Sequence, residues 1–237
     1  MRILKKSLVI FVLLSAVFTS FVSCDRDYDE NEVVSVAEAL IKKSAILEDI
    51  LFGEGFSPDS TDTSSSTFKR ADERSIKKYE GLLGKEIKKL DDLRALIANV
   101  YTPGYANDIY SGVLYGSIDS NTRYYEDFVY ETDINGKEVQ TPVIMVDTTY
   151  KIRKKDDIQY HYSTLKVVDV NGEKITVAIE VTVTQNKGAS NEKKQNKTIE
   201  IDLIEDATGW RLDTPTFAVY NEDADKIKEL ENELNNR

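Results

Sequence analysis

The spacing of apolar residues changes once along the chain, and this change constrains the fold more than any other feature. Before about residue 120 the apolar residues recur at helical spacing, whereas from Arg123 they recur at every second position. The alternation is clearest at residues 175–183, where Ile or Val alternates with Thr, Ala or Glu. A strand with one buried face has this period. Helices followed by hairpin-joined strands predict an α+β fold, with N-terminal helices packed on an antiparallel β-meander.

The helical half contains one strongly amphipathic segment and two weaker ones. Residues 33–51 have the period of a long helix, and the glycines that follow end it. Residues 53–75 are rich in Ser, Thr, Asp and Gly, and we expect a long mobile loop there. Residues 75–90 show only weak alternation and are predicted to be irregular, with one short strand as the alternative. Asp91 or Asp92 can cap a helix that ends near Val100, and a second helical stretch follows Thr102-Pro103-Gly104.

The second half predicts a series of short strands. Asn135-Gly136 and Asn171-Gly172 are hairpin turn sequences. Residues 186–197 are predicted to form a polar loop. The expected strands are Tyr124–Glu131, Val139–Val146, Thr148–Arg153, Gln159–Val170, a strand that begins near Ile175, a strand around Ile201, and Gly209–Leu212. Trp210 is predicted to anchor the core from the last strand. Residues 221–237 are expected to contain a short acidic helix.

The first 24 residues have the order of a bacterial lipoprotein signal. A basic region at residues 2–6 precedes an apolar run at residues 7–21. The run is shorter than the roughly 20 residues of a membrane-spanning helix. It ends at Ser23-Cys24, so we expect residues 1–23 to be removed and Cys24 to be lipidated. The alternative is an ordinary secretory signal in which the cysteine is incidental.

Residues 24–32 then form a short acidic tether ahead of a single domain at residues 33–220. Removing residues 1–23 takes away three positive charges and no negative ones, so the net charge changes from -11 to -14. The acidic run is either a surface-sorting signal of bacteria with two membranes or a solvated spacer. Both alternatives predict a protein outside the cytoplasm, attached to a membrane of the cell envelope through its N-terminal lipid.

The composition excludes several classes of function. One cysteine and one histidine cannot form a disulfide framework, a Cys-rich zinc site or a His metal triad. The acidic surplus argues against nucleic-acid binding, which needs Lys and Arg to neutralise phosphates. We therefore expect no catalytic residues, no metal and no cofactor. His161 is expected to lie on the solvent face of a strand, and a general base is the alternative.

Tyrosine has the most uneven distribution of any residue type. Seven of the 13 tyrosines lie between residues 101 and 130. Tyrosine suits binding surfaces because it combines a large apolar ring with a polar tip. The other interpretation is that these rings pack where the helices meet the sheet. The candidates for partner contact are Tyr101, Tyr105, Tyr110, Tyr115, Tyr124 and Tyr125.

Three segments together resemble a known family. They are the opening helix Val36-Ala37-Glu38-Ala39-Leu40-Ile41, the stretch from Leu90-Asp91-Asp92-Leu93 to Tyr105-Ala106, and the end of the meander from Gly209-Trp210-Arg211-Leu212 to Thr216. On a secreted or anchored bacterial chain, this combination is similar to the IseA (YoeB) family of cell-wall DL-endopeptidase inhibitors, over residues 33–220. The lipid anchor, the Ser/Thr-rich residues 57–67 and the acidic C-terminal helix depart from that family.

The resemblance implies a non-enzymatic protein that binds the catalytic domain of NlpC/P60-type peptidoglycan hydrolases and blocks their active-site cleft. An alternative is an envelope module with an NTF2-like or cystatin-like sheet that holds a small ligand or serves as a scaffold. A ligand module should have an apolar pocket under its sheet. An inhibitor should instead expose a cleft or a loop.

Overall fold

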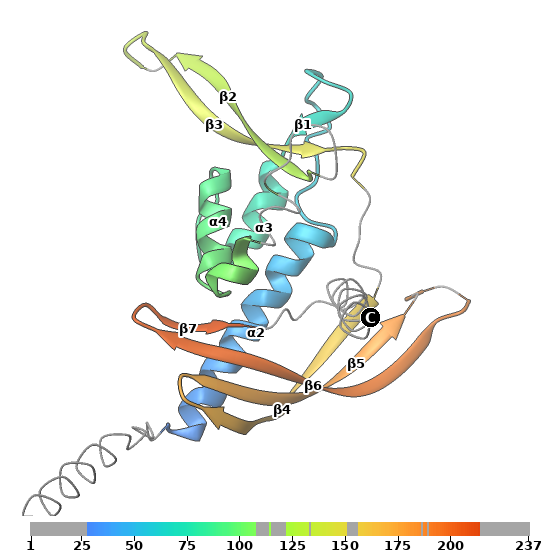
Figure 1. The fold of residues 1–237 in the computed structure, drawn as a ribbon. Coiled ribbons are helices and arrows are strands. Elements are labelled where there is room, and N and C mark those ends of the chain that lie inside the picture. Colours follow the sequence, from blue (N-terminus) through green and yellow to red (C-terminus); the bar gives the residue numbers. More distant parts are fainter. Residues whose placement is uncertain are drawn as a thin grey trace, which may run out of the picture.

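Helix α2 (Glu30–Phe52) is the central element of the fold and connects two antiparallel sheets (Figure 1). The computed structural model describes residues 28–107, 114, 122–132, 134–150, 156–185, 187–188 and 190–213. Asp29 caps the helix by accepting the Asn31 N–H at 2.9 Å. The predicted helix at residues 33–51 is confirmed. It begins three residues earlier, inside the expected tether, because the cap and the acidic first turn favour helix there.

The two sheets lie at opposite ends of α2. The first has the order β1-β3-β2 and consists of β1 (Phe68–Arg70), β2 (Tyr124–Thr132) and β3 (Glu138–Asp147). The second has the order β4-β5-β6-β7 and consists of β4 (Asp156–Asn171), β5 (Lys174–Gln185), β6 (Lys193–Asp206) and β7 (Gly209–Leu212). The α+β class with antiparallel strands is confirmed. The division of the strands into two sheets was not predicted.

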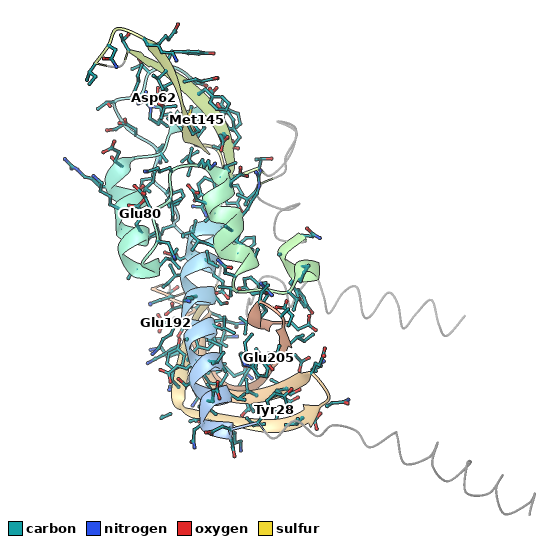
Figure 2. All side chains as sticks on the ribbon, turned by 90° about the vertical axis from the view of Figure 1, so that its left-hand side faces the viewer. Tyr28, Asp62, Glu80, Met145, Glu192 and Glu205 are labelled. Carbon is teal, nitrogen blue, oxygen red and sulfur yellow. The ribbon has the colours of Figure 1, made fainter. Side chains whose placement is uncertain are left out.

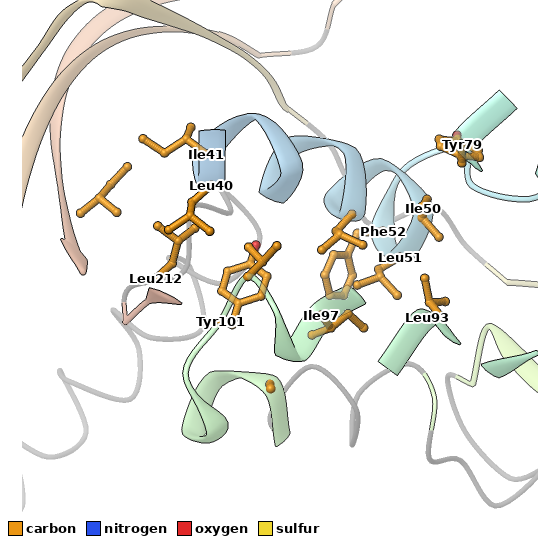
Figure 3. Close-up of a cluster of buried hydrophobic side chains, with 14 of the residues drawn as sticks. Leu40, Ile41, Ile50, Leu51, Phe52, Tyr79, Leu93, Ile97, Tyr101 and Leu212 are labelled. Atoms are coloured by element: carbon orange, nitrogen blue, oxygen red, sulfur yellow. The ribbon is translucent and has the colours of Figure 1, made fainter. Parts of the chain in front are cut away.

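One continuous hydrophobic core joins the helices to both sheets. Leu40 and Ile41, from the first half of α2, lie beside Leu212 of β7 (Figure 3). The second half of α2 packs on α3 (Glu73–Leu83) and α4 (Leu90–Ala98), where Leu51 and Ile97 are fully buried. Each fully buried aliphatic side chain stabilises the fold by about 1.5–3 kcal/mol. The helix therefore holds the two sheets in one structure.

Two sequence predictions are wrong for segments in the first half of the chain. Residues 68–70, expected in the loop, form β1 because they pair with Met145–Asp147 of β3. Residues 73–83, expected to be mostly irregular, form α3. The Asp72 carboxylate caps this helix, and Gly84 ends it at φ 65°. The mobility expected for residues 53–75 stays a prediction, but the carboxylate of Asp62 accepts the Arg70 N–H there.

The strand predictions need three smaller corrections. Thr148 and Thr149 form a turn, and Tyr150 has no regular structure. The expected strand at Thr148–Arg153 is therefore wrong for its described part. Lys193 to Lys197 belong to β6, because they pair with Val181–Gln185 of β5. These residues are exposed and polar on both faces, so no apolar alternation marks them. In the β4–β5 hairpin Asn171 pairs with Lys174, so the two turn residues are Gly172 and Glu173.

The predicted helix at residues 221–237, the signal segment with Cys24, and residue 109 lie outside the described residues. Among the described residues, no helix is both long and apolar enough to cross a membrane.

Candidate functional site

Two of the tyrosines predicted to contact a partner are core residues. Tyr101 is 1% exposed, and its hydroxyl lies 2.7 Å from the hydroxyl of Ser44. Tyr124 is 0% exposed, donates to the Ile50 carbonyl at 2.7 Å and accepts the Phe56 N–H at 2.9 Å. Burial raises the pKa of the Tyr124 phenol well above its usual range. The hydroxyls of both tyrosines bond to residues of α2. Tyr101 and Tyr124 therefore pack in the core and are not available to a partner.

The remaining predicted tyrosines do not form one surface. Tyr105 lines an open hollow of about 460 Å³, together with residues from Thr102 to Gly104 and from the β6–β7 end of the second sheet. Tyr125 belongs to the first sheet, where its ring meets the ring of Phe68 edge-on at 4.8 Å. Burial raises its pKa. Tyr110 and Tyr115 lie outside the described residues. Partner contact stays a prediction for Tyr105 and Tyr125.

A buried arginine, which the sequence analysis missed, holds the C-terminal end of α2. Arg123 is 3% exposed, and its guanidinium donates to the carbonyls of Gly53, at 2.8 Å, and Glu54. The same guanidinium lies over the rings of Tyr124 and Tyr150, with its carbon 5.2 and 5.0 Å from their centroids. A cation at a helix C-terminus balances the helix dipole. Arg123 therefore stabilises the junction between α2 and β2.

His161 has a structural partner. Its Nε2 lies 2.8 Å from the Thr182 hydroxyl on the neighbouring strand β5, and its side chain is partly buried. The expected solvent-face position is therefore only partly correct. Among the described residues, no group of three His, Cys, Asp or Glu side chains is placed to hold a metal ion.

The most exposed apolar surface lies on the β2–β3 hairpin. Phe128 is 45% exposed, Tyr130 66%, Ile134 103% and Val139 42%. They are four of the seven large exposed hydrophobic residues in the described part of the chain. The hairpin projects beyond the helices at one end of the molecule (Figure 1). Exposed apolar side chains that gather on one element are typical of interaction sites, so this hairpin is the strongest candidate site.

The strand register explains why these side chains are exposed. Tyr124, Glu126, Phe128 and Tyr130 share one face of β2, because side chains alternate along a strand. At the base of the hairpin this face is buried, and the Glu126 carboxylate accepts the Leu90 N–H of α4 at 3.1 Å. Farther out the strand extends past the helices, so Phe128 and Tyr130 continue the apolar face without cover. The sequence does not mark this site, because the period of a strand predicts which side chains share a face and not how much of that face is covered.

At the opposite end of the molecule, Tyr28 contacts the second sheet. The Tyr28 hydroxyl donates to the Gly172 carbonyl at 3.2 Å, and its ring meets Trp210 edge-on at 5.6 Å. Trp210 is only partly buried, whereas Leu212, two residues on, is 0% exposed and is the deeper anchor. Figure 2 labels Tyr28 at this end and Met145, at the base of the hairpin, near the other. Comparison of the chain with protein-family models, curated proteins and solved structures finds no match.

Proposed function

We propose that the chain is an envelope lipoprotein, anchored through Cys24, that acts by binding another protein and is not an enzyme. The observation that carries this proposal is the position of two features at opposite ends of the molecule. The segment that follows Cys24 is fixed at Tyr28, on the second sheet, and the exposed apolar hairpin is the outer part of the first sheet, at the other end of the molecule (Figures 1 and 2).

The position of Tyr28 supports a proposal for which end a lipid at Cys24 would hold at the membrane. Three residues separate Cys24 from Tyr28, and an extended chain over these four Cα–Cα steps spans about 14 Å at most. The β4–β5 turn, which Tyr28 contacts, is then held close to the lipid. Helix α2 has 23 residues and so covers about 34 Å between the two sheets. A lipid at Cys24 would therefore present the hairpin away from the membrane, towards the cell wall.

The resemblance to the IseA (YoeB) family supplies the partner class for this proposal. Its members inhibit NlpC/P60-type DL-endopeptidases, which are located in the wall layer. A narrow, paired hairpin with exposed apolar side chains suits insertion into a cleft such as a peptidase active site. We therefore propose, more specifically, that the chain inhibits these peptidases.

The ligand-module alternative receives less support from the packing. An NTF2-like or cystatin-like module would hold its ligand against the sheet, in the space that α2 occupies here. Ile41 of α2 and Leu212 of β7 are both 0% exposed, and Leu40 lies beside Leu212 (Figure 3). Lys42 also lies over the Tyr162 ring of β4, at 4.8 Å from its centroid. Helix and sheet thus fill the space at these contacts. The hollow of about 390 Å³ that remains between Val33 of α2 and Ile175 of β5 is open to solvent, which favours protein binding over an enclosed ligand.

Inhibition is tested with a soluble domain of residues 25–237 and the purified catalytic domains of the host's NlpC/P60 endopeptidases. Release of peptides from purified wall is measured at increasing molar ratio. We expect activity to fall in proportion to the added domain and to vanish near equimolar amounts, with the domain itself left uncleaved. Full peptidase activity at a tenfold excess of the domain, at low salt, would contradict the inhibitor proposal.

Anchoring is tested separately by Cys24→Ala in the full chain. We expect the variant to leave the membrane fraction or to accumulate as an uncleaved precursor, because the thioether that carries the lipid cannot form. Ser20→Ala, four residues earlier, keeps the cysteine and should stay in the membrane fraction. A Cys24→Ala protein that is normally processed and still membrane-bound would show that the anchor lies elsewhere.

A further inference from the structure

We propose that the outer part of the β2–β3 hairpin, residues 128–139, is a docking tip that inserts into an apolar recess of a protein whose rim carries Lys and Arg. This inference rests on the proposed function only in that the chain binds a protein. It holds for a wall peptidase or for another envelope protein with such a recess.

The distribution of apolar side chains around the hairpin indicates insertion. Phe128 and Tyr130 lie on one face, and Val139, which pairs with Glu131, lies on the other. Ile134 is fully exposed in the turn at the end. A hairpin that rests on a flat surface needs one apolar face, whereas this one is apolar on both faces and at its end. A recess that surrounds the tip would bury all four side chains, and aromatic residues in such pockets contribute most to binding.

The charges around the tip specify the chemistry of the rim. Between residues 126 and 139 the chain carries one basic residue, Lys137, and five acidic ones: Glu126, Asp127, Glu131, Asp133 and Glu138. The side chains of Asp127, Glu131 and Glu138 are exposed. Acidic groups that border an apolar contact favour a partner with basic groups in matching positions, and they exclude an acidic one. The rim of the recess should therefore carry Lys or Arg.

The same charges argue against two other occupants. Strand β2 is one of the two edge strands of the sheet β1-β3-β2, so a second copy could pair along it. Such pairing would bring the carboxylates of Glu126, Asp127 and Glu131 from two copies together, and charges on edge strands prevent this kind of association. A lipid surface with anionic headgroups would repel the same carboxylates. A basic-rimmed protein is the occupant that both the apolar and the charged side chains fit.

The hairpin is held in the shape that it would have in the complex. All nine residues of β2 pair with β3, and Tyr124 and Arg123 fasten its base to the end of α2. A partner therefore binds a preformed element and loses little affinity to the ordering of a loop.

Site-specific photo-crosslinking in host cells tests the docking tip on the full chain. A photoreactive phenylalanine analogue replaces Tyr130 in one strain and Leu82 in another. Leu82, on α3, is the matched control because it is also a large exposed apolar residue, 57% exposed, but lies outside the hairpin. We expect a discrete protein adduct from position 130 and none from position 82, with the adduct identified by mass spectrometry.

Charge reversal tests the rim. In the strain with the photoreactive residue at position 130, Glu131→Lys combined with Glu138→Lys should lower the adduct yield by about tenfold or more, since like charges at an interface cost several kcal/mol. Glu200→Lys on β6 is the control. It reverses one charge at an exposed position of the other sheet and should leave the yield within about twofold.

The outcomes distinguish a failure of the docking tip from a failure of the proposed function. An adduct with a wall endopeptidase that charge reversal weakens supports both, and the same behaviour with another protein supports the tip alone. No adduct at position 130, an adduct with a second copy or with lipid, or a yield that charge reversal leaves unchanged overturns the tip. If the soluble domain inhibits a peptidase while position 130 gives no adduct, the function stands and its contact surface lies elsewhere.

Discussion

Tyr124→Phe tests the buried connection between α2 and β2. The Tyr124 hydroxyl donates to the Ile50 carbonyl near the end of α2 and accepts the N–H of Phe56 just beyond it. Phenylalanine keeps the ring, which packs against Phe56 at a centroid distance of 5.2 Å, and removes only the oxygen. The substitution therefore isolates the two hydrogen bonds from the packing of the ring.

The expected loss follows from the groups that the substitution leaves without partners. A carbonyl and an N–H remain in a site where the phenol was 0% exposed. Each buried unsatisfied backbone group costs about 1–3 kcal/mol, so the free energy of unfolding should fall by about 2–6 kcal/mol. Tyr130→Phe, at a site 66% exposed, is the matched control and should change it by less than about 0.5 kcal/mol.

Urea denaturation of the soluble domain measures both variants. The midpoint should fall for Tyr124→Phe while the slope stays constant, because the area exposed on unfolding is unchanged. Amide exchange at Phe56 should also accelerate, since its N–H loses its acceptor. A loss below about 1 kcal/mol, with exchange at Phe56 unaltered, would refute the view that this hydroxyl bridges the helix and the hairpin.

Three other perturbations test neighbouring parts of the structure. Gly55→Ala should cost more than about 3 kcal/mol in thermal or chemical unfolding, because φ is +59° and a Cβ would lie 2.2 Å from the Tyr124 oxygen. The pKa of the Asp62 carboxyl is lowered from 3.8 to about 2, chiefly by the hydrogen bond from the backbone N–H of Arg70. Its contribution to stability is therefore complete above about pH 4 and is lost as the pH falls towards 2, so Asp62→Asn should flatten that part of the stability–pH curve. Trp210→Ala should cost about 2–3 kcal/mol in denaturant, less than the 3–5 kcal/mol of a fully buried Trp, because the ring is partly exposed against Tyr28. A loss above 4 kcal/mol would mean that Trp210, and not Leu212, is the main anchor of β7.

Local patterns predicted the elements whose stability depends on one covered face. Helix α2 and strand β5 both have a complete apolar stripe, so the 3.6- and 2-residue periods in the sequence located them. Helix α3 buries only Tyr79 fully, so it has no apolar stripe that a period could reveal. The cap residues Asp72 and Gly84 are the signals in the sequence that mark its two ends. The first residues of β6 had no such signal, because both of their faces are polar and their partner strand alone makes them a strand.

The candidate site was accessible to sequence reasoning only in part. The concentration of tyrosines indicated the region between residues 101 and 130, and the hairpin at residues 124–147 was predicted with its strands close to the observed bounds. The tyrosines themselves were assigned to one surface, yet Tyr101 and Tyr124 are core residues and Tyr125 lies on a different sheet from the hollow that Tyr105 lines.

The sequence alone determined the class of each strong element and the hairpin connections, because both depend on the period of side chains and on turn residues that are neighbours in the chain. The tertiary structure decided how the strands divide into two sheets and which apolar faces are covered. Phe128 and Tyr124 occupy equivalent places in the same alternation, yet Tyr124 is buried under α2 and Phe128 is 45% exposed. The difference arises because α2 and α4 end before the hairpin does, and no pattern within β2 records the length of its neighbours.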